Sequence, residues 1–139
     1  MSVATADRSR IDLSSTTALL AAGDLTAILL FVSVGEYTHG YNPLVDVGRV
    51  LGTFLPFLVG WLLVAGVAGL YASDAPGTLA TATLVTLLSW ILAVAVAQIL
   101  RATLFFHGGA ALTFAVVSVL VGGLFLCLWR VTATMTLGR

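Results

Sequence analysis

The sequence contains no lysine, and only 9% of its 139 residues are charged. Six arginines balance six acidic residues, so the formal net charge is zero and no basic surface for nucleic acid is expected. The single cysteine, Cys127, excludes a disulfide within the chain and is interpreted as a small core residue. We find no nucleophile paired with a base, no phosphate-cradling loop and no paired carboxylates on one helix, and therefore predict that the protein is not an enzyme.

Apolar residues dominate what is present, at 60% of the chain, with a mean hydropathy of +1.11. A soluble domain of this size has too little interior to hide so much apolar surface. The apolar residues fall into four runs of about 20, the length that crosses a hydrocarbon core roughly 30 Å thick. The sequence therefore predicts an all-α, multi-pass protein of the cell membrane whose solvent is the lipid bilayer.

Turn residues separate the four runs and set the expected spans. The breaks are short, so consecutive helices are expected to be antiparallel, in an up-down-up-down four-helix transmembrane bundle. The first run is too long for a signal-peptide core and has no clear cleavage site, which favours a retained helix. We predict a membrane domain over residues 17–133, with tails at 1–16 and 134–139 and spans at 17–38, 47–72, 78–100 and 110–131.

The arginines favour one orientation of this bundle. Four lie on the side of the two termini and two on the other, which by the positive-inside rule places both termini in the cytoplasm. The first group is Arg8, Arg10, Arg130 and Arg139, and the second is Arg49 and Arg101. Trp129, beside Arg130, is assigned to the aromatic belt at the membrane surface.

Asp24 lies inside the first apolar run, where a carboxylate costs about 2.5–3.5 kcal/mol on insertion scales. We expect it to be protonated and to donate a hydrogen bond to a neighbouring helix. Antiparallel geometry places three hydroxyls of the third span and two glycines of the fourth at similar depth: Thr83, Thr86, Ser89, Gly122 and Gly123. Asp24 is then either a site that handles protons or substrate, or a neutral acid that fixes helix packing.

A second polar set gathers at the opposite ends of the spans, with members from all three of the first helices. It comprises Glu36, His39, Arg49, Gln98, Arg101 and His107. If the polar faces of the first and third helices both point inward, a polar path runs from Asp24 toward His39 and Arg101. Either the arginines grip an anionic group through their planar forks, or they extend to lipid headgroups and pair with acidic neighbours.

His39 and His107 raise the possibility of a metal or haem site. Both lie next to glycine at the end of a span, and the sequence has neither a third ligand nor a haem-attachment motif. We therefore predict no metal and no cofactor.

An ordered set of residues resembles the domain of unknown function 3054 family, small prokaryotic four-span membrane proteins. The resemblance covers roughly 23–131 and rests on Asp24, Gly35, His39-Gly40, Pro56-Phe57, Gly60-Trp61, Trp90, Arg101 and Trp129-Arg130. Relatives often carry arginine after the first glycine, where this chain has Glu36, which puts a shared anion-binding role at that position in doubt. The resemblance implies the four-span topology and leaves the activity open. The lysine-free, alanine-rich composition also suggests a prokaryotic source.

Two functions fit these features. The first is transport or sensing of a small solute or proton by an oligomer, with Asp24 as the protonatable site and Glu36, His39, Arg49 and Arg101 as a gate or recognition cluster. The second is a non-transporting accessory or assembly subunit of a larger membrane complex, which small residues on the helices and little mass outside the membrane would suit equally.

Overall fold

The computed structural model describes residues 11–72 and 78–137, and these residues contain helices and no strand. The elements are α1 (Ser15–Thr38), α2 (Val47–Val67), α3 (Leu79–Arg101), α4 (Leu112–Val117), the π-helical segment η1 (Ser118–Gly122) and α5 (Gly123–Leu137). The last three form one continuous helix, Leu112–Leu137. The predicted turn at 73–77, most of the N-terminal tail, and the arginines Arg8, Arg10 and Arg139 lie outside the described residues.

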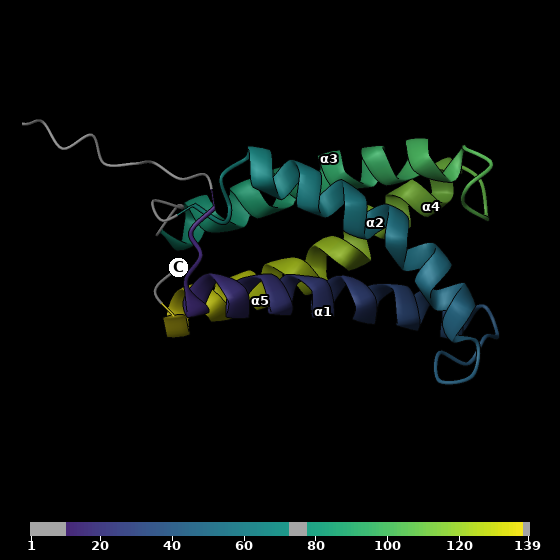
Figure 1. The fold of residues 1–139 in the computed structure, drawn as a ribbon, viewed down its shortest axis with the longest axis horizontal. Coiled ribbons are helices and arrows are strands. Elements are labelled where there is room, and N and C mark those ends of the chain that lie inside the picture. Colours follow the sequence, from purple (N-terminus) through teal and green to yellow (C-terminus); the bar gives the residue numbers. More distant parts are fainter. Residues whose placement is uncertain (1–10, 73–77, 138–139) are drawn as a thin grey trace, which may run out of the picture.

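Four helices of the described chain are long and apolar enough to cross a membrane, which confirms the predicted fold class. Successive helices run in opposite directions, with α1 beside α5 and α2 beside α3 (Figure 1). The helix α3 also packs against α5, whereas α1 and α3 lie diagonally opposite and their backbones make no contact. This arrangement decides which polar side chains can meet.

Local signals start and stop the helices. The hydroxyl of Ser14 caps α1 by accepting a hydrogen bond from the N–H of Thr17 at 3.2 Å, and that of Thr78 caps α3 through the N–H of Thr81 at 3.3 Å. Such caps satisfy amide groups that the first turn of a helix leaves without a partner.

Glycines in the left-handed conformation end α1 and α2 in the same way. Gly40 has a φ of +91° and Gly69 a φ of +76°. The next residue in each case donates its N–H back into the helix, Tyr41 to the carbonyl of Glu36 and Leu70 to that of Ala65, both at 3.0 Å. This is the Schellman motif, and at Gly69 it folds the chain back against the bundle.

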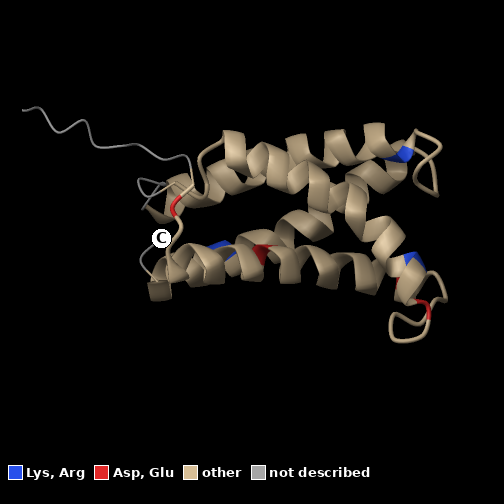
Figure 2. Ribbon diagram, in the orientation of Figure 1, with Lys and Arg blue, Asp and Glu red and all other residues tan. Residues whose placement is uncertain are grey.

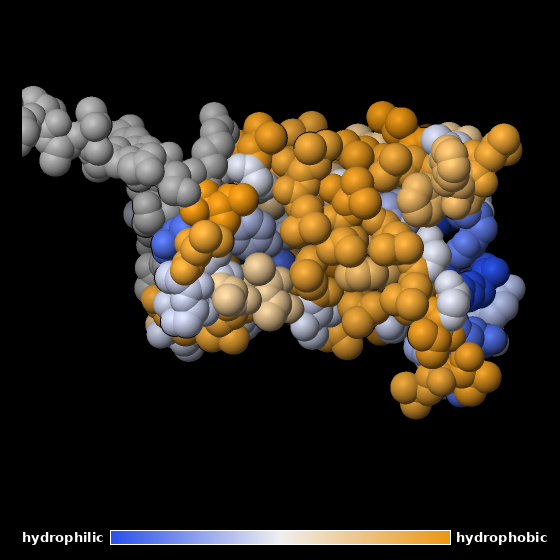
Figure 3. Space-filling view, viewed as in Figure 1, coloured by the Kyte–Doolittle hydropathy of each residue, from blue (hydrophilic) through white to orange (hydrophobic). Residues whose placement is uncertain are grey.

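The surface and the charges are arranged as lipid solvation requires. Leucine and valine side chains are exposed on every long helix, and apolar residues cover the middle of the face shown in Figure 3. Charged residues lie at the two ends, apart from red and blue segments that meet on the paired helices α1 and α5 (Figure 2). The described chain is therefore a multi-pass membrane protein with a charge pair inside its span.

An aromatic cluster fills the centre of the bundle. Phe57 stacks on Trp90 with ring centroids 5.6 Å apart, and Phe31 meets both rings edge-on. Phe114 and Trp61 extend the cluster along the bundle. Edge-to-face and offset contacts of this kind suit the ring quadrupoles, so the middle of the bundle is a packed apolar layer.

The π-helical segment has an identifiable cause. The indole N–H of Trp90 donates to the carbonyl of Ser118 at 2.8 Å, a carbonyl that the widened turn makes available. A Cβ atom at Gly122 would lie 2.4 Å from the same indole ring, so only glycine leaves room for it. Gly122, which was expected at the depth of Asp24, packs against Trp90.

Candidate functional site

Asp24 is fully buried and forms an ion pair with Arg130 of α5, which is 4% exposed. The guanidinium grips the carboxylate with two atoms: Nε lies 2.8 Å from Oδ1 and Nη2 lies 2.5 Å from Oδ2. Two parallel hydrogen bonds of this kind are the strongest arrangement available to an arginine and a carboxylate. We call this the inner ion pair.

A third donor reaches the same carboxylate from the end of α2. The hydroxyl of Tyr71 donates to Oδ2 of Asp24 at 2.5 Å and accepts the indole N–H of Trp61 at 2.9 Å. Burial, and then the charge of Asp24, raise the pKa of the Tyr71 phenol above its usual range, so the hydroxyl keeps its proton and remains a donor. The turn at Gly69 delivers Tyr71 to this place, and the backbone N–H of Asp12 also binds the Tyr71 carbonyl, at 2.7 Å.

The partners expected for Asp24 were wrong. The hydroxyl of Thr83 binds the carbonyl of Leu79 in its own helix, that of Thr86 is buried without a partner, and Ser89 makes no bond to Asp24. The reason is the diagonal placement of α1 and α3, which leaves α5 as the neighbour of Asp24. Two donors from Arg130 and one from Tyr71 point at Asp24, so its carboxyl oxygens accept hydrogen bonds, whereas we expected this group to donate one.

Arg130 and Trp129 do not lie in the belt that was expected at the membrane surface. The last helix continues to Leu137, so Arg130 lies about 10 Å inside its end rather than at the membrane surface. Trp129 is half-buried and donates its indole N–H to the carbonyl of Leu20 at 3.1 Å. If the last span had been predicted to continue to Leu137, Arg130 would have been expected at the depth of Asp24.

The second polar set is brought together only in part, at the far end of the bundle. Glu36 accepts from Nε of Arg49 at 2.8 Å and from the hydroxyl of Thr53 at 2.6 Å. Nε2 of His107 lies 3.1 Å from the same hydroxyl. Because the hydroxyl proton of Thr53 is given to Glu36, His107 is the donor in that contact. Gly52 makes space for the imidazole, since a Cβ there would lie 2.6 Å from the ring.

Arg101 completes this group from the last turn of α3 and is 7% exposed. Its Nε donates to the carbonyl of Gly109 at 3.2 Å, and its guanidinium lies 4.3 Å above the ring of Phe114. Arg49 and Glu36 are within electrostatic range of Arg101, yet among the described residues no carboxylate forms a salt bridge with it and its Nη1 is buried without an acceptor. We call Glu36, Arg49, Thr53, Arg101 and His107 the end cluster.

His39, which was predicted to join this group, does not. It forms the exposed C-terminal cap of α1, and its imidazole has no hydrogen bond or ion pair with the described residues. Gln98 lies beside the end cluster, where its side-chain carbonyl accepts the N–H of Ala111 at 3.3 Å. Thr53 and Tyr71 were not among the predicted site residues, and a lone threonine or a tyrosine beyond a helix end gives no sequence pattern that identifies it.

The proposed polar path between the two sites is closed. Asp24 and Glu36 are separated by about 18 Å along α1, and Phe31 lies between them. Phe31 belongs to the aromatic cluster, whose rings pack against one another across the bundle. The inner ion pair and the end cluster are therefore two separate sites, with an apolar layer between them.

Both sites fall within a family match. Residues 21–133 match the family described as protein of unknown function (DUF3054), which confirms the resemblance seen in the sequence. The chain belongs to this family. The match spans Asp24 and Arg130 as well as the whole end cluster, and it includes most of each helix that positions them. No curated protein and no solved structure matches this DUF3054 member.

The few residues of metal-binding type in the described part of this DUF3054 member do not form a cluster. No group of three or more histidine, cysteine, aspartate or glutamate side chains gathers within residues 11–72 and 78–137. Glu36 uses its carboxylate for Arg49 and Thr53, so it is the acceptor of both of these hydrogen bonds in the end cluster.

Proposed function

We propose that this protein binds a small anionic solute at the end cluster and transports or senses it in the cell membrane. The observation that carries the proposal is that the guanidinium of Arg101 is buried without a carboxylate partner in the described chain. The inner ion pair uses Arg130, and Glu36 uses Arg49, but the buried guanidinium of Arg101 has no carboxylate partner among the described residues.

The physical argument concerns charge as well as hydrogen bonding. A buried donor without an acceptor costs about 1–3 kcal/mol, and more when it is charged. Water would supply an acceptor but no opposite charge, whereas an anion supplies both. The planar fork of arginine suits carboxylate and phosphate groups, and the N–H of His107 and the guanidinium of Arg49 lie in the same cluster.

Asp24 takes a different role in this proposal from the one predicted. Its carboxylate is held by three donors, so proton transfer through it would require the inner ion pair to break. We assign Asp24 to holding α1, α5 and the end of α2 together. The solute, and not a proton on Asp24, is the species that is recognised.

Within residues 11–72 and 78–137, a single copy offers no continuous polar route, because the aromatic cluster closes the bundle at its centre. Transport would therefore use a path between copies in a homo-oligomer, and sensing would use a partner that reads the state of the end cluster. The proposal includes no chemical reaction.

Anion binding is the first test. The detergent-solubilised protein is titrated with phosphate, sulfate, acetate and chloride, and binding is followed by calorimetry and by thermal unfolding. We expect at least one of these anions to bind and Arg101→Gln to weaken it by about 10- to 150-fold, since a charged hydrogen bond contributes about 1.5–3 kcal/mol. His39→Gln is the matched control, because His39 is exposed at the same end of the bundle.

Flux of the bound anion into proteoliposomes then separates transport from sensing. If none of the four anions binds, or if Arg101→Gln and His39→Gln bind equally well, the proposal is wrong. A stoichiometric foreign protein that co-purifies in mild detergent, with no anion bound, would favour the accessory-subunit function instead.

A further inference from the structure

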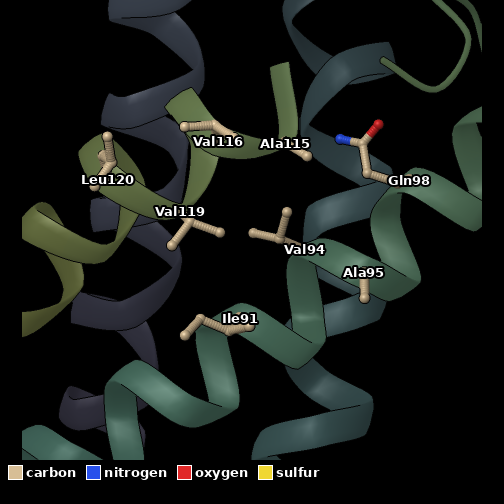
Figure 4. Close-up of a pocket in the computed structure, with 8 residues that line it drawn as sticks. All are labelled: Ile91, Val94, Ala95, Gln98, Ala115, Val116, Val119 and Leu120. Atoms are coloured by element: carbon tan, nitrogen blue, oxygen red, sulfur yellow. The ribbon is translucent and has the colours of Figure 1, made fainter. Parts of the chain in front are cut away.

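An apolar groove runs along the outside of the bundle between α3 and the α4–η1 segment. Its volume is about 330 Å³, and we call it the α3–α4 groove. Val94 and Val119 face one another across it (Figure 4). The groove is lined by Ile91, Val94, Ala95, Gln98, Ala115, Val116, Val119 and Leu120.

Gln98 is the one polar residue of this lining, and it stands at one end of the groove. Its carbonyl is used by Ala111, but its amide Nε2 is buried without an acceptor among the described residues. Figure 4 shows this nitrogen turned toward Ala115 on the opposite wall. A second hollow of about 320 Å³ shares Gln98 and Ala115 and extends the groove to residues 110–112. The apolar groove thus leads to an unsatisfied donor near the end of the bundle.

We infer that the α3–α4 groove binds an anionic phospholipid, with an acyl chain along its apolar walls and an ester or phosphate oxygen accepting from Nε2 of Gln98. The depth supports a lipid, because Gln98 lies about 4.5 Å inside the end of α3, where the hydrocarbon region meets the headgroups. The charge supports an anionic headgroup, because Arg101 follows one turn later and has no carboxylate partner within the described chain.

A neighbouring groove provides the contrast. The groove between α2 and α3 is larger, about 460 Å³, yet its lining includes no amide and no charged side chain. Its one polar lining residue is the buried Ser89, which lies near the middle of α3, so this groove can hold acyl chains but presents no polar group at the depth of the headgroups. We expect selective binding only at the α3–α4 groove.

Native mass spectrometry of the full chain tests this inference. The protein is released from detergent in the presence of dioleoyl phosphatidylglycerol or dioleoyl phosphatidylcholine. We expect one phosphatidylglycerol to remain bound, at an affinity several times higher than that of phosphatidylcholine. Gln98→Leu should weaken it by about fivefold or more, the effect of losing one hydrogen bond.

Two exposed alanines supply matched variants. Ala95→Trp fills the α3–α4 groove and should reduce phosphatidylglycerol binding by roughly tenfold, whereas Ala68→Trp fills the α2–α3 groove and should not change it. Equal binding of the two lipids, an equal loss in both tryptophan variants, or an unchanged affinity in Gln98→Leu would each overturn the inference.

Soluble glycerol phosphate distinguishes the lipid from a free anion. It should fail to displace the lipid at concentrations near the lipid's own dissociation constant. If it competes equally well, the acyl chain contributes nothing and the inference is wrong, while the proposed anion site at the end cluster would stand. Conversely, if none of the four anions binds, or if Arg101→Gln and His39→Gln bind them equally well, the proposed function is wrong, but this inference stands if Gln98→Leu and Ala95→Trp still lower the affinity for the lipid.

Discussion

Replacing Asp24 by asparagine is expected to destabilise the bundle by about 3–5 kcal/mol, because the change leaves Arg130 charged and buried without its partner. Asp24 is 0% exposed and Arg130 is 4% exposed, so neither group can turn to water in the folded chain. Asparagine keeps the size of the side chain, which separates the loss of charge from a loss of packing. A whole domain is stable by only about 5–15 kcal/mol, so the expected loss is a large share.

The magnitude depends on both partners, and a double-mutant cycle measures it. Asp24→Leu together with Arg130→Met removes both charges and keeps apolar volume, and should recover most of the stability lost by either change alone. Arg49→Gln is the control, because the side chain of Arg49 is 42% exposed and its pair with Glu36 should contribute less than about 1 kcal/mol.

Reversible unfolding in mixed micelles, followed by circular dichroism, supplies the free energies. A loss of less than about 1 kcal/mol in Asp24→Asn, or a double variant whose loss equals the sum of the two single losses, would contradict this prediction. Either result would mean that the inner ion pair is solvated or broken in the membrane.

Three further predictions concern the network, the packing and the orientation. Tyr71→Phe should lower the free energy of unfolding by about 1–2 kcal/mol in the same assay. Because folding raises the pKa of Tyr71, the wild type should keep its full stability below the ordinary phenol pKa of 10 and lose stability above it. The variant should show no such loss at high pH. Gly60→Ala should cost about 1–3 kcal/mol, since its Cβ would lie 2.5 Å from the carbonyl oxygen of Ala93, whereas Gly66→Ala, with open space around it, should be neutral or stabilising; equal effects would contradict the packing. Reporter fusions at both termini should fluoresce as green fluorescent protein and stay inactive as alkaline phosphatase, and the opposite pattern would reverse the orientation.

Much of the fold follows from patterns that are local in the chain. Apolar runs of about 20 residues predict spans whatever packs beside them, and short breaks force antiparallel neighbours. The end of the last helix was harder to predict, because the polar residues after Val131 are threonines that bond to their own helix. Thr132, Thr134 and Thr136 each donate a hydrogen bond to the carbonyl four residues earlier. These bonds hide the hydroxyls from lipid and let the helix continue to Leu137.

The sequence predicted most residues of the candidate sites, but it did not predict which of these residues pair with one another. Asp24, Glu36, Arg49, Arg101 and His107 stand out in any charge-poor sequence, since polar groups in a span need a reason. His39 stood out equally, but it is the exposed C-terminal cap of α1. Thr53 contributes through a position next to Glu36 that only the packing of α1 on α2 creates.

By itself the sequence determined the solvent of this protein, the number of its spans and the presence of charge at depth, because hydropathy and helix length act residue by residue along the chain. The tertiary structure alone decided which charges meet. Asp24 finds its partner 106 residues away, in a helix whose neighbourhood with α1 depends on how all four helices pack. The same packing gives Glu36 to Arg49 and leaves Arg101 without a carboxylate in the described chain, since two charges neutralise each other only where their helices bring them within reach.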